Sequence, residues 1–314
     1  MGSRKWTRSF SVPGSEDDAM ELGRFGVWCS LEGGSLRDAV EAAQRIEALG
    51  YSALWQPMAL RRDVMVTASL QLAATQRLVV ATGIAPIYER APLVMAAAQR
   101  ALGEQSGDRF LLGLGVSHAM FTQPLFGRAY GPPLRAMREY LDVMDAGAAL
   151  PGAPAGKAQP AGPRVLAALG PNMLALARDR AQGAHPYFMP PEHTRRAREI
   201  LGPDRWLCPE VKVVLETDPA RARALARAAG VINITLPNYQ RAWREFLGFD
   251  DVDFASGGSD RLIDATVAWG DAAAIRKHLD RHFEAGATQV CIHPVGAGGP
   301  MSGPNWEVLE ALAP

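Results

Sequence analysis

The chain has 314 residues, 48% of them hydrophobic, so it can bury the core of one large α/β domain or two small ones. Its 33 basic and 33 acidic side chains balance, which leaves no overall field toward nucleic acid or an anionic membrane, and we expect neither as a partner. No apolar run is long enough to cross a bilayer, and the N-terminal residues lack the basic-then-apolar pattern of a signal peptide, so we expect none. Cys29, Cys208 and Cys291 lack CxxC spacing and paired histidines, which predicts buried reduced thiols in a cytoplasmic protein and no metal site.

Two segments differ in composition from the rest of the chain. Residues 1–20 are polar and broken by Pro and Gly, and we expect a disordered tail there. Residues 151–163 read as a flexible linker. Strand–helix alternation resumes directly behind that linker, so we interpret it as an insertion and expect residues 21–314 to form a single domain.

In the first half of the chain, apolar runs alternate with segments of helical spacing. The runs at residues 24–30, 51–56, 78–84 and 110–115 predict strands. Helices are expected after Ser35, over residues 63–75, and over residues 91–106 with Pro92 in the first turn. Strands joined by helices in this way form parallel pairs. Residues 119–133 contain Gly, Pro and aromatics without a period, so we expect a long loop there.

The alternation continues in the second half. Strands are predicted at residues 164–169, 183–187, 207–216 and 288–293, with helices over 134–144, from Gly170 to about 181, over 192–201, after the N-cap Asp218, and over 272–285 and 305–312. Residues 231–270 read as an excursion of helical pieces before the last strand. Eight strands with intervening helices favour an α/β fold, a closed (β/α)8 TIM barrel with insertions.

Several collinear segments resemble the bacterial-luciferase-like superfamily. They include ATGIAPIYERAP (81–92), GDRFLLGLGVSH (107–118), RVLAALGPNMLALARDRAQGAHPY (164–187) and EAGATQVCIHPV (284–295). Within that superfamily the resemblance is closest to the branch that uses the deazaflavin coenzyme F420. It implies a luciferase-like barrel and an oxidoreductase that moves a hydride between the deazaflavin and a small organic substrate. A homodimer is compatible with the same resemblance.

In a barrel of this kind the active site lies at the carboxyl ends of the strands. That rule nominates Gln56, Met58, Ser117, His185, Tyr187 and His293. For His185 and His293 the alternative is a structural role as hydrogen-bonded core or rim histidines. The resemblance adds a bulge at Gly83, Ile84 and Ala85 that supports the coenzyme ring, with a cis peptide bond between the first two.

The turn into the helix after residue 169 is a second candidate. Its backbone N–H groups are unpaired and the helix dipole adds positive character, which suits the phosphate of the coenzyme side chain. Pro171 donates no N–H, so we expect Gly170, Asn172 and Met173 to bind the phosphate.

His118 follows the fourth strand and titrates near neutrality, so it is our candidate for proton transfer. The Asp-His pair that related deazaflavin dehydrogenases carry after the second strand is replaced here by Met58 and Ala59, which cannot exchange a proton. Two alternatives therefore stay open: an FMN-dependent monooxygenase on the same fold, and a cofactor-free binding protein on a degenerate barrel. A Rossmann domain is disfavoured, because GLGVSH lacks the third glycine and the distal acidic residue.

Overall fold

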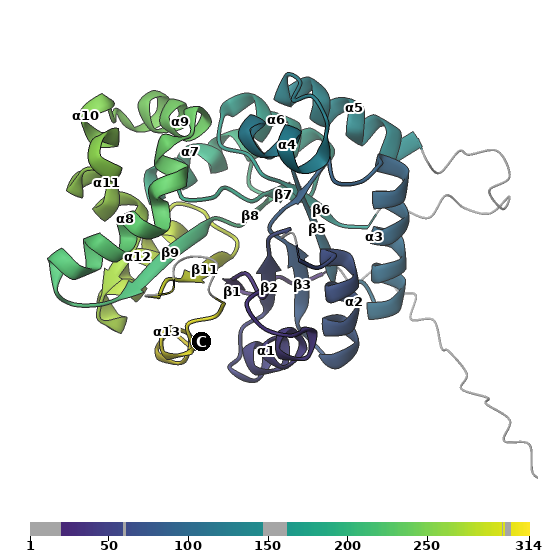
Figure 1. Ribbon diagram of the computed structural model, residues 1–314, viewed down its shortest axis with the longest axis horizontal. Helices are drawn as coiled ribbons and strands as arrows, with labels where there is room; N and C mark the ends of the chain where they lie inside the picture. Colours follow the sequence, from purple (N-terminus) through teal and green to yellow (C-terminus); the bar gives the residue numbers. More distant parts are fainter. Residues whose placement is uncertain (1–19, 59–60, 147–161, 297, 299–302) are drawn as a thin grey trace, which may run out of the picture.

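The computed structural model describes residues 20–58, 61–146, 162–296, 298 and 303–314. The predicted tail and nearly all of the predicted linker lie outside these residues. The described part forms a parallel sheet curled into a barrel and covered by helices on its outside (Figure 1). Among the described residues, no helix has the length and apolar character that a membrane span requires.

Every strand pair in the sheet is parallel. The strands are β1 (Phe25–Trp28), β2 (Ala53–Gln56), β3 (Val79–Thr82), β4 (Ala85–Pro86), β5 (Phe110–Gly115), β6 (Arg164–Leu166), β7 (Gly183–Ala184), β8 (Trp206–Leu207), β9 (Glu210–Leu215), β10 (Val267–Gly270) and β11 (Val290–Pro294). Their order is β10-β9-β11-β1-β2-β3-β5-β6-β7-β8, and β4 also pairs with β5. Since β4 continues β3, and β8 and β9 are two parts of one strand, the eight predicted strands are confirmed and β10 is an addition.

The barrel closes at the interrupted strand β8–β9. On one side β7 pairs with β8, and a bridge between Tyr187 and Glu210 continues that contact. On the other side, the N–H of Thr288 donates to the carbonyl of Leu207 over 2.8 Å, and β11 pairs with β9. The ring of strands is therefore continuous, as the count of eight predicted.

Side chains fill the barrel interior and alternate with those that face the helices. Trp55, Ala81 and Leu111 pack inside the barrel, whereas Leu54 and Val80 belong to the outer core beneath the helices. Cys208 and Cys291 lie in the inner group, and all three cysteines are buried and unpaired, which confirms the expectation of free thiols.

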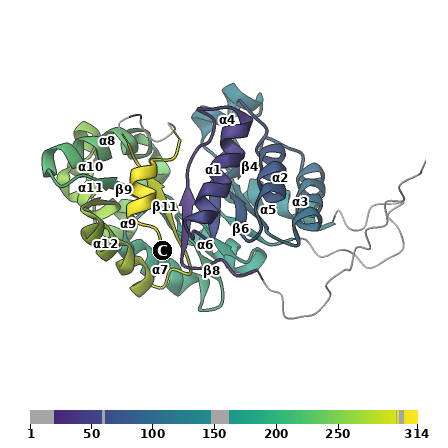
Figure 2. The same ribbon diagram turned by 90° about the horizontal axis from the view of Figure 1, so that it is seen from below.

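The helices that follow the strands cover the outside of the barrel (Figures 1 and 2). The last helix lies beside the first, where the Arg45 guanidinium stacks over the Trp306 ring at 4.1 Å and pairs with Glu310. The covering helices are α1 (Leu36–Ala48), α2 (Val64–Ala74), α3 (Pro92–Ser106), α5 (Pro133–Ala146), α6 (Pro171–Arg180), α7 (Pro191–Leu201), α8 (Pro219–Thr235), α12 (Ala272–Glu284) and α13 (Trp306–Ala311).

Two connections add helices at the carboxyl ends of the strands. The loop predicted over residues 119–133 is partly wrong, because α4 (Ala119–Phe126) begins directly after His118 and contains Pro124. The excursion expected over residues 231–270 is confirmed: it consists of the end of α8, then α9 (Pro237–Leu247), α10 (Asp251–Phe254), the 3₁₀ helix η2 (Ala255–Gly257), α11 (Asp260–Thr266) and β10. Figure 1 shows α4, α9 and α10 at the end of the molecule toward which β1, β2 and β3 point.

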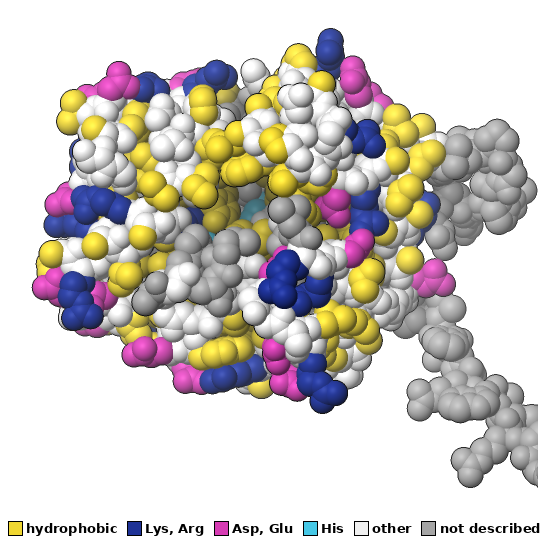
Figure 3. Space-filling view, in the orientation of Figure 1, with side chains coloured by type: hydrophobic (Ala, Val, Ile, Leu, Met, Phe, Trp, Pro, Cys, Tyr) yellow, Lys and Arg dark blue, Asp and Glu magenta, His cyan; other side chains and the backbone are white. Residues whose placement is uncertain are grey.

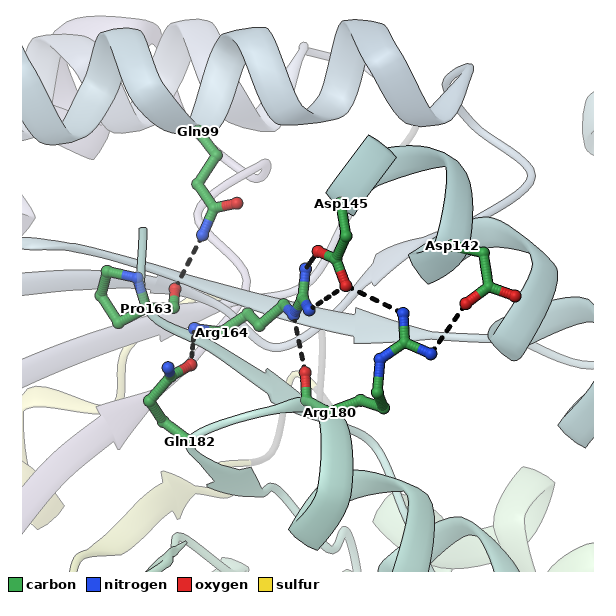
Figure 4. A network of polar contacts seen from close by, with 7 residues as sticks. All are labelled: Gln99, Asp142, Asp145, Pro163, Arg164, Arg180 and Gln182. Carbon is green, nitrogen blue, oxygen red and sulfur yellow. Dashed lines mark hydrogen bonds and ion pairs between the residues drawn. The ribbon is translucent and has the colours of Figure 1, made fainter. Parts of the chain in front are cut away.

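A buried arginine fixes the start of β6 (Figure 4). The guanidinium of Arg164 bonds both carboxylate oxygens of Asp145 at 2.7 and 3.0 Å, and its Nε donates to the carbonyl of Arg180. Asp145 also accepts from Arg180, and the backbone N–H of Arg164 donates to Gln182. This bidentate pairing ties β6 to α5 and α6, and so fixes the strand that leads to the Gly170 turn.

Three histidines lie on α7 and α12, two of them fully buried and His278 partly buried. His193 and His282 are fully buried, and His282 bonds the hydroxyl of Thr194 through Nδ1 at 2.8 Å. The rings of His278 and His282 lie 5.8 Å apart. Burial lowers the pKa of His193 and His278 to about 4, and burial together with the nearby His278 and Arg281 lowers that of His282 well below its usual value. All three imidazoles are therefore neutral in the folded chain near pH 7.

Acidification is expected to destabilise the fold between pH 6.5 and 4. The unfolded chain takes up protons on these histidines below pH 6.5, whereas the folded chain does so only near pH 4, so the free energy of unfolding falls by about 1.4 kcal/mol per pH unit for each histidine. Urea unfolding at pH 7 and pH 5 measures this, and H278Q/H282Q should flatten the dependence. Equal pH slopes for the wild type and H278Q/H282Q would contradict the assignment.

Candidate functional site at the barrel mouth

The end of the third strand places main chain at the centre of the barrel mouth. The peptide bond between Gly83 and Ile84 is cis, as the resemblance implied. The Gly83 N–H donates to the carbonyl of Gln56 over 2.8 Å, and the carbonyl of Ile84 accepts from the Met58 N–H over 3.2 Å. Both peptide groups are thereby tied to the end of β2, and we call the pair Gly83–Ile84 the backbone wall.

Glycines on β5 leave room for the backbone wall. A Cβ on Gly113 would lie 2.0 Å from the carbonyl oxygen of Thr82, and one on Gly115 would lie 2.6 Å from Cδ1 of Ile84. A side chain at Gly113 would displace the end of β3, and one at Gly115 would displace the side chain of Ile84. The Gly-Leu-Gly sequence of β5 therefore allows close packing between strands. This agrees with the expectation that these glycines do not belong to a Rossmann dinucleotide-binding motif.

Trp28 links the backbone wall to the opposite side of the mouth. Its indole Nε1–H donates to the carbonyl of Gly83 over 2.7 Å, in a buried position. The indole ring lies 4.3 Å from the ring of His293 and 5.2 Å from that of Tyr187, measured between centroids. One side chain thus fixes the spacing between strands that are far apart in the sequence.

His185 lies beneath the backbone wall and offers an unused acceptor. Its ring stacks on Trp55 at 4.4 Å, and its Nδ1–H donates to the carbonyl of Cys208 over 2.6 Å. Burial lowers the pKa of His185 to about 4, so the ring is neutral and Nε2 carries a lone pair. That Nε2 is buried without a hydrogen-bond partner in the described chain, and it is 3.3 Å from the position that a Cβ on Gly83 would take.

The Gly170 turn forms another part of the mouth. Gly170 is the N-cap of α6, and no atom lies within 4 Å of the position where its Cβ would be, so the space above the turn is open. The turn is held from behind by His193, whose Nε2–H donates to the carbonyl of Leu169 over 2.7 Å. The residues predicted to bind the phosphate are at least partly accessible: Gly170 and Met173 are half-buried and Asn172 is exposed, and Pro171 between them is half-buried.

Ser117 and His118 lie at the rim after β5. Ser117 has a positive φ of 55°, and its carbonyl accepts from the hydroxyl of Tyr130 over 3.2 Å. His118 is the N-cap of α4, where its carbonyl accepts from the Thr122 N–H over 2.9 Å, and its ring lies 6.1 Å from that of Tyr239. Burial lowers the pKa of His118, so this half-buried imidazole is neutral near pH 7.

A buried charged group on β9 and β11 was not predicted from the sequence. Oε1 of Glu210 lies 3.1 Å from Nζ of Lys212 and 2.6 Å from Nδ1 of His293, and all three side chains are at most 1% exposed. Oε2 accepts from the N–H of Phe188 over 2.9 Å. Nδ1 of His293 is also 3.4 Å from the hydroxyl of Tyr187. The two charges two residues apart on an otherwise apolar strand were the available signal, because such residues share one face of the strand.

The charges in this group compensate one another. Burial would raise the pKa of Glu210, but Lys212 and His293 outweigh burial and lower it to about 2, so the carboxylate is ionised. Burial and the Glu210 carboxylate raise the pKa of Tyr187 well above its usual value, so the phenol keeps its proton.

Two of the other predicted site residues contribute less than their positions suggested. The side-chain amide of Gln56 is buried and paired with Gln71 at 2.6 Å, which leaves its backbone carbonyl as its contribution to the mouth. Ala85 is buried in β4, and Ala59 lies outside the described residues. No group of three metal-ligating side chains occurs within the described ranges.

The space-filling view shows a hollow in the middle of the face above the ends of β1 and β2 (Figure 3). Mostly hydrophobic side chains surround it, and a histidine is visible inside it. The mouth is thus not completely filled by the described side chains. Three features lie around this end of the barrel: the backbone wall, the open N-terminus of α6 and the buried charged group of Glu210, Lys212 and His293.

Comparison with known proteins assigns the chain to a family. The model of the luciferase-like monooxygenase family matches residues 20–289. The chain therefore belongs to this family.

Relatives differ in the coenzyme that they bind. A Mycobacterium tuberculosis protein provisionally named a coenzyme F420-dependent oxidoreductase is 27% identical, over 87% of this chain and 94% of its own length. An F420-dependent secondary alcohol dehydrogenase, solved with an F420–acetone adduct, has a TM-score of 0.69 at 16% identity, covering 93% of this chain and 97% of its own. The oxygenating constituent of 3,6-diketocamphane monooxygenase from Pseudomonas putida, solved with FMN, has a TM-score of 0.64 at 15% identity, covering 94% and 97%. At these identities the two structures show a shared fold.

Removing one member of the buried charged group is expected to destabilise the fold. E210Q leaves the Lys212 ammonium buried without its counter-charge, and we expect a loss of about 3–5 kcal/mol in the free energy of unfolding. E210Q/K212M should recover much of that loss, since neither charge then remains. Denaturant unfolding measures the free energy of unfolding of both variants. E139Q is the control, because Glu139 and Arg135 form an exposed ion pair, which contributes little to stability. A loss in E210Q no larger than in E139Q would refute the assignment.

Proposed function

We propose that the protein is an oxidoreductase that uses coenzyme F420 to transfer a hydride to or from a small organic substrate. The observation that carries the proposal is the backbone wall, a main-chain surface at the centre of the barrel mouth that Trp28, Gly113 and Gly115 hold in place. The relative that aligns along most of the chain bears the name of an F420-dependent oxidoreductase, which supports the same coenzyme.

The residues present fit a planar ring with a phosphate-bearing side chain. The backbone wall offers a flat surface, and Nε2 of His185 is a buried acceptor without a partner in the described chain, beside that surface. The open N-terminus of α6 supplies the N–H groups of Asn172 and Met173 to a phosphate. When bound, the deazaflavin supplies a ring carbon that gives or accepts a hydride.

The chain's own residues then position the substrate and handle protons. Met58 contributes an apolar surface to the pocket. It stands where related enzymes carry a residue of the Asp-His pair, and its thioether cannot exchange a proton. His118, neutral and half-buried at the rim, is the group we assign to proton transfer. With the Asp-His pair absent, orientation of substrate against the ring supplies most of the acceleration.

FMN is the second candidate coenzyme, because a neighbour of the same fold was solved with FMN. The same wall and the same turn would serve its ring and phosphate, and the protein would then act as a monooxygenase. The structural features described above are common to both, so binding has to discriminate between them.

Titration of the purified chain with F420 and with FMN, followed by fluorescence, tests the proposal. We expect F420 to bind at least ten times more tightly than FMN. W28F removes the hydrogen bond to the Gly83 carbonyl and leaves that carbonyl unpaired, so F420 affinity should fall by about threefold to tenfold. W306F is the matched control, because Trp306 stacks on Arg45 on the outside of the barrel.

Two outcomes would overturn the proposal. Tight FMN binding without F420 binding would favour the monooxygenase. Failure to bind either coenzyme would favour a binding protein on a degenerate barrel.

A further inference from the structure

Tyr187 differs from the side chains behind it in its exposure. Glu210, Lys212 and His293 are at most 1% exposed, whereas Tyr187 is only partly buried, at the carboxyl end of β7 where the barrel opens. Tyr187 is therefore the one side chain of this contact that is not fully buried. A buried ion pair costs desolvation energy, and fixing the position of a partly buried phenol is a use that stability alone does not explain.

The hydrogen bonds leave the proton of Tyr187 available. Glu210 is ionised and can only accept, so Nδ1 of His293, 2.6 Å from its Oε1, must carry the hydrogen between them. The hydroxyl oxygen of Tyr187, 3.4 Å from the same Nδ1, faces a donor and can only accept from it. Its own O–H is then free to donate to a molecule in the mouth.

The surroundings keep the proton on that hydroxyl. Nζ of Lys212 lies 3.9 Å from the centroid of the Tyr187 ring and 3.1 Å from Oε1 of Glu210, which neutralises the ammonium. The raised pKa of Tyr187 keeps the phenol protonated, as a donor requires. Such a donor stabilises an oxygen that gains negative charge during a reaction.

Trp28 sets where this donor lies relative to the coenzyme surface. The same indole donates to the Gly83 carbonyl over 2.7 Å and contacts the Tyr187 ring edge to face at 5.2 Å. Trp28 therefore contacts both the backbone wall and the Tyr187 ring, and it fixes the position of Tyr187 relative to the wall.

Resting on the proposed function, we infer that Tyr187 binds and polarises the oxygen of a carbonyl substrate, so that the substrate class is ketones or aldehydes and the corresponding alcohols. In the reducing direction the carbonyl carbon receives the hydride and the C=O π pair moves to the oxygen. Tyr187 stabilises that oxygen by hydrogen bonding. The alkoxide takes its proton from the imidazolium form of His118, which must first take up a proton from solvent because the resting imidazole is neutral; in the oxidising direction the neutral imidazole accepts that proton. His293 and Glu210 are positioning residues that act through Tyr187.

Turnover of matched ketones and imines by reduced F420 tests the substrate class. The probes are cyclohexanone and cyclopentanone against 1-piperideine and 1-pyrroline. We expect turnover of the ketones, and a fall in kcat of about 100-fold in Y187F. Y51F is the matched control, because the Tyr51 hydroxyl donates to the Leu309 carbonyl away from the mouth, and its kcat should match the wild type.

A second readout does not depend on turnover. With oxidised F420 bound, the dissociation constant of cyclohexanone should rise by about threefold to tenfold in Y187F and stay unchanged in Y51F. H293L should weaken cyclohexanone binding similarly, H293N should restore it because its amide N–H replaces Nδ1–H, and Y187F/H293L should be no weaker than Y187F alone. A merely structural role for His293 would not give this non-additivity.

The outcomes separate the two proposals. Loss of coenzyme binding in the wild type would overturn both. Normal F420 binding with imine but no ketone turnover, or Y187F equal to wild type in kcat and cyclohexanone affinity, would overturn the role of Tyr187 and leave the proposed function standing.

Discussion

The structure depends on a close approach of main chain to main chain at the barrel mouth. The backbone wall reaches the centre of the mouth only because β5 carries no side chains at Gly113 and Gly115, where a Cβ would collide with β3 or Ile84. The indole of Trp28 then satisfies the Gly83 carbonyl that this approach leaves buried. A surface made of peptide groups is flat and changes little with side-chain rotamers, so it suits a planar ligand. The side chains around it can differ in polarity while that surface is kept.

The buried charged group adds polarity to a mouth that is otherwise apolar and aromatic. Its members come from neighbouring strands, β9 and β11, so the closure of the barrel is what brings Glu210 to His293. Ionised groups in such a place cost desolvation energy, which the structure offsets with three hydrogen bonds to the carboxylate and a cation over two aromatic rings. Fold and site are therefore coupled, because the strand contact that closes the barrel also orients the partly buried phenol of Tyr187.

Most of the fold could be predicted from the sequence, because apolar runs and helical spacing alternate regularly. The strand count followed from those runs, and the cis bond at Gly83 from a resemblance carried by specific segments. Helix α4 was missed because Pro124 and the flanking glycines obscure its period. The pairing of Glu210, Lys212 and His293 was missed for a different reason. Their spacing along the chain shows a shared strand face for the first two, but the third joins them only through the order of strands, which no local pattern encodes.

The account's central claim is that a planar redox coenzyme rests on the backbone wall. A crystal structure of the chain with oxidised F420 tests it most directly. The account predicts the ring against Gly83 and Ile84, the phosphate at the start of α6, and free space between the ring and the hydroxyl of Tyr187. Coenzyme bound outside the barrel mouth, or a mouth closed by side chains with the ring excluded, would contradict it.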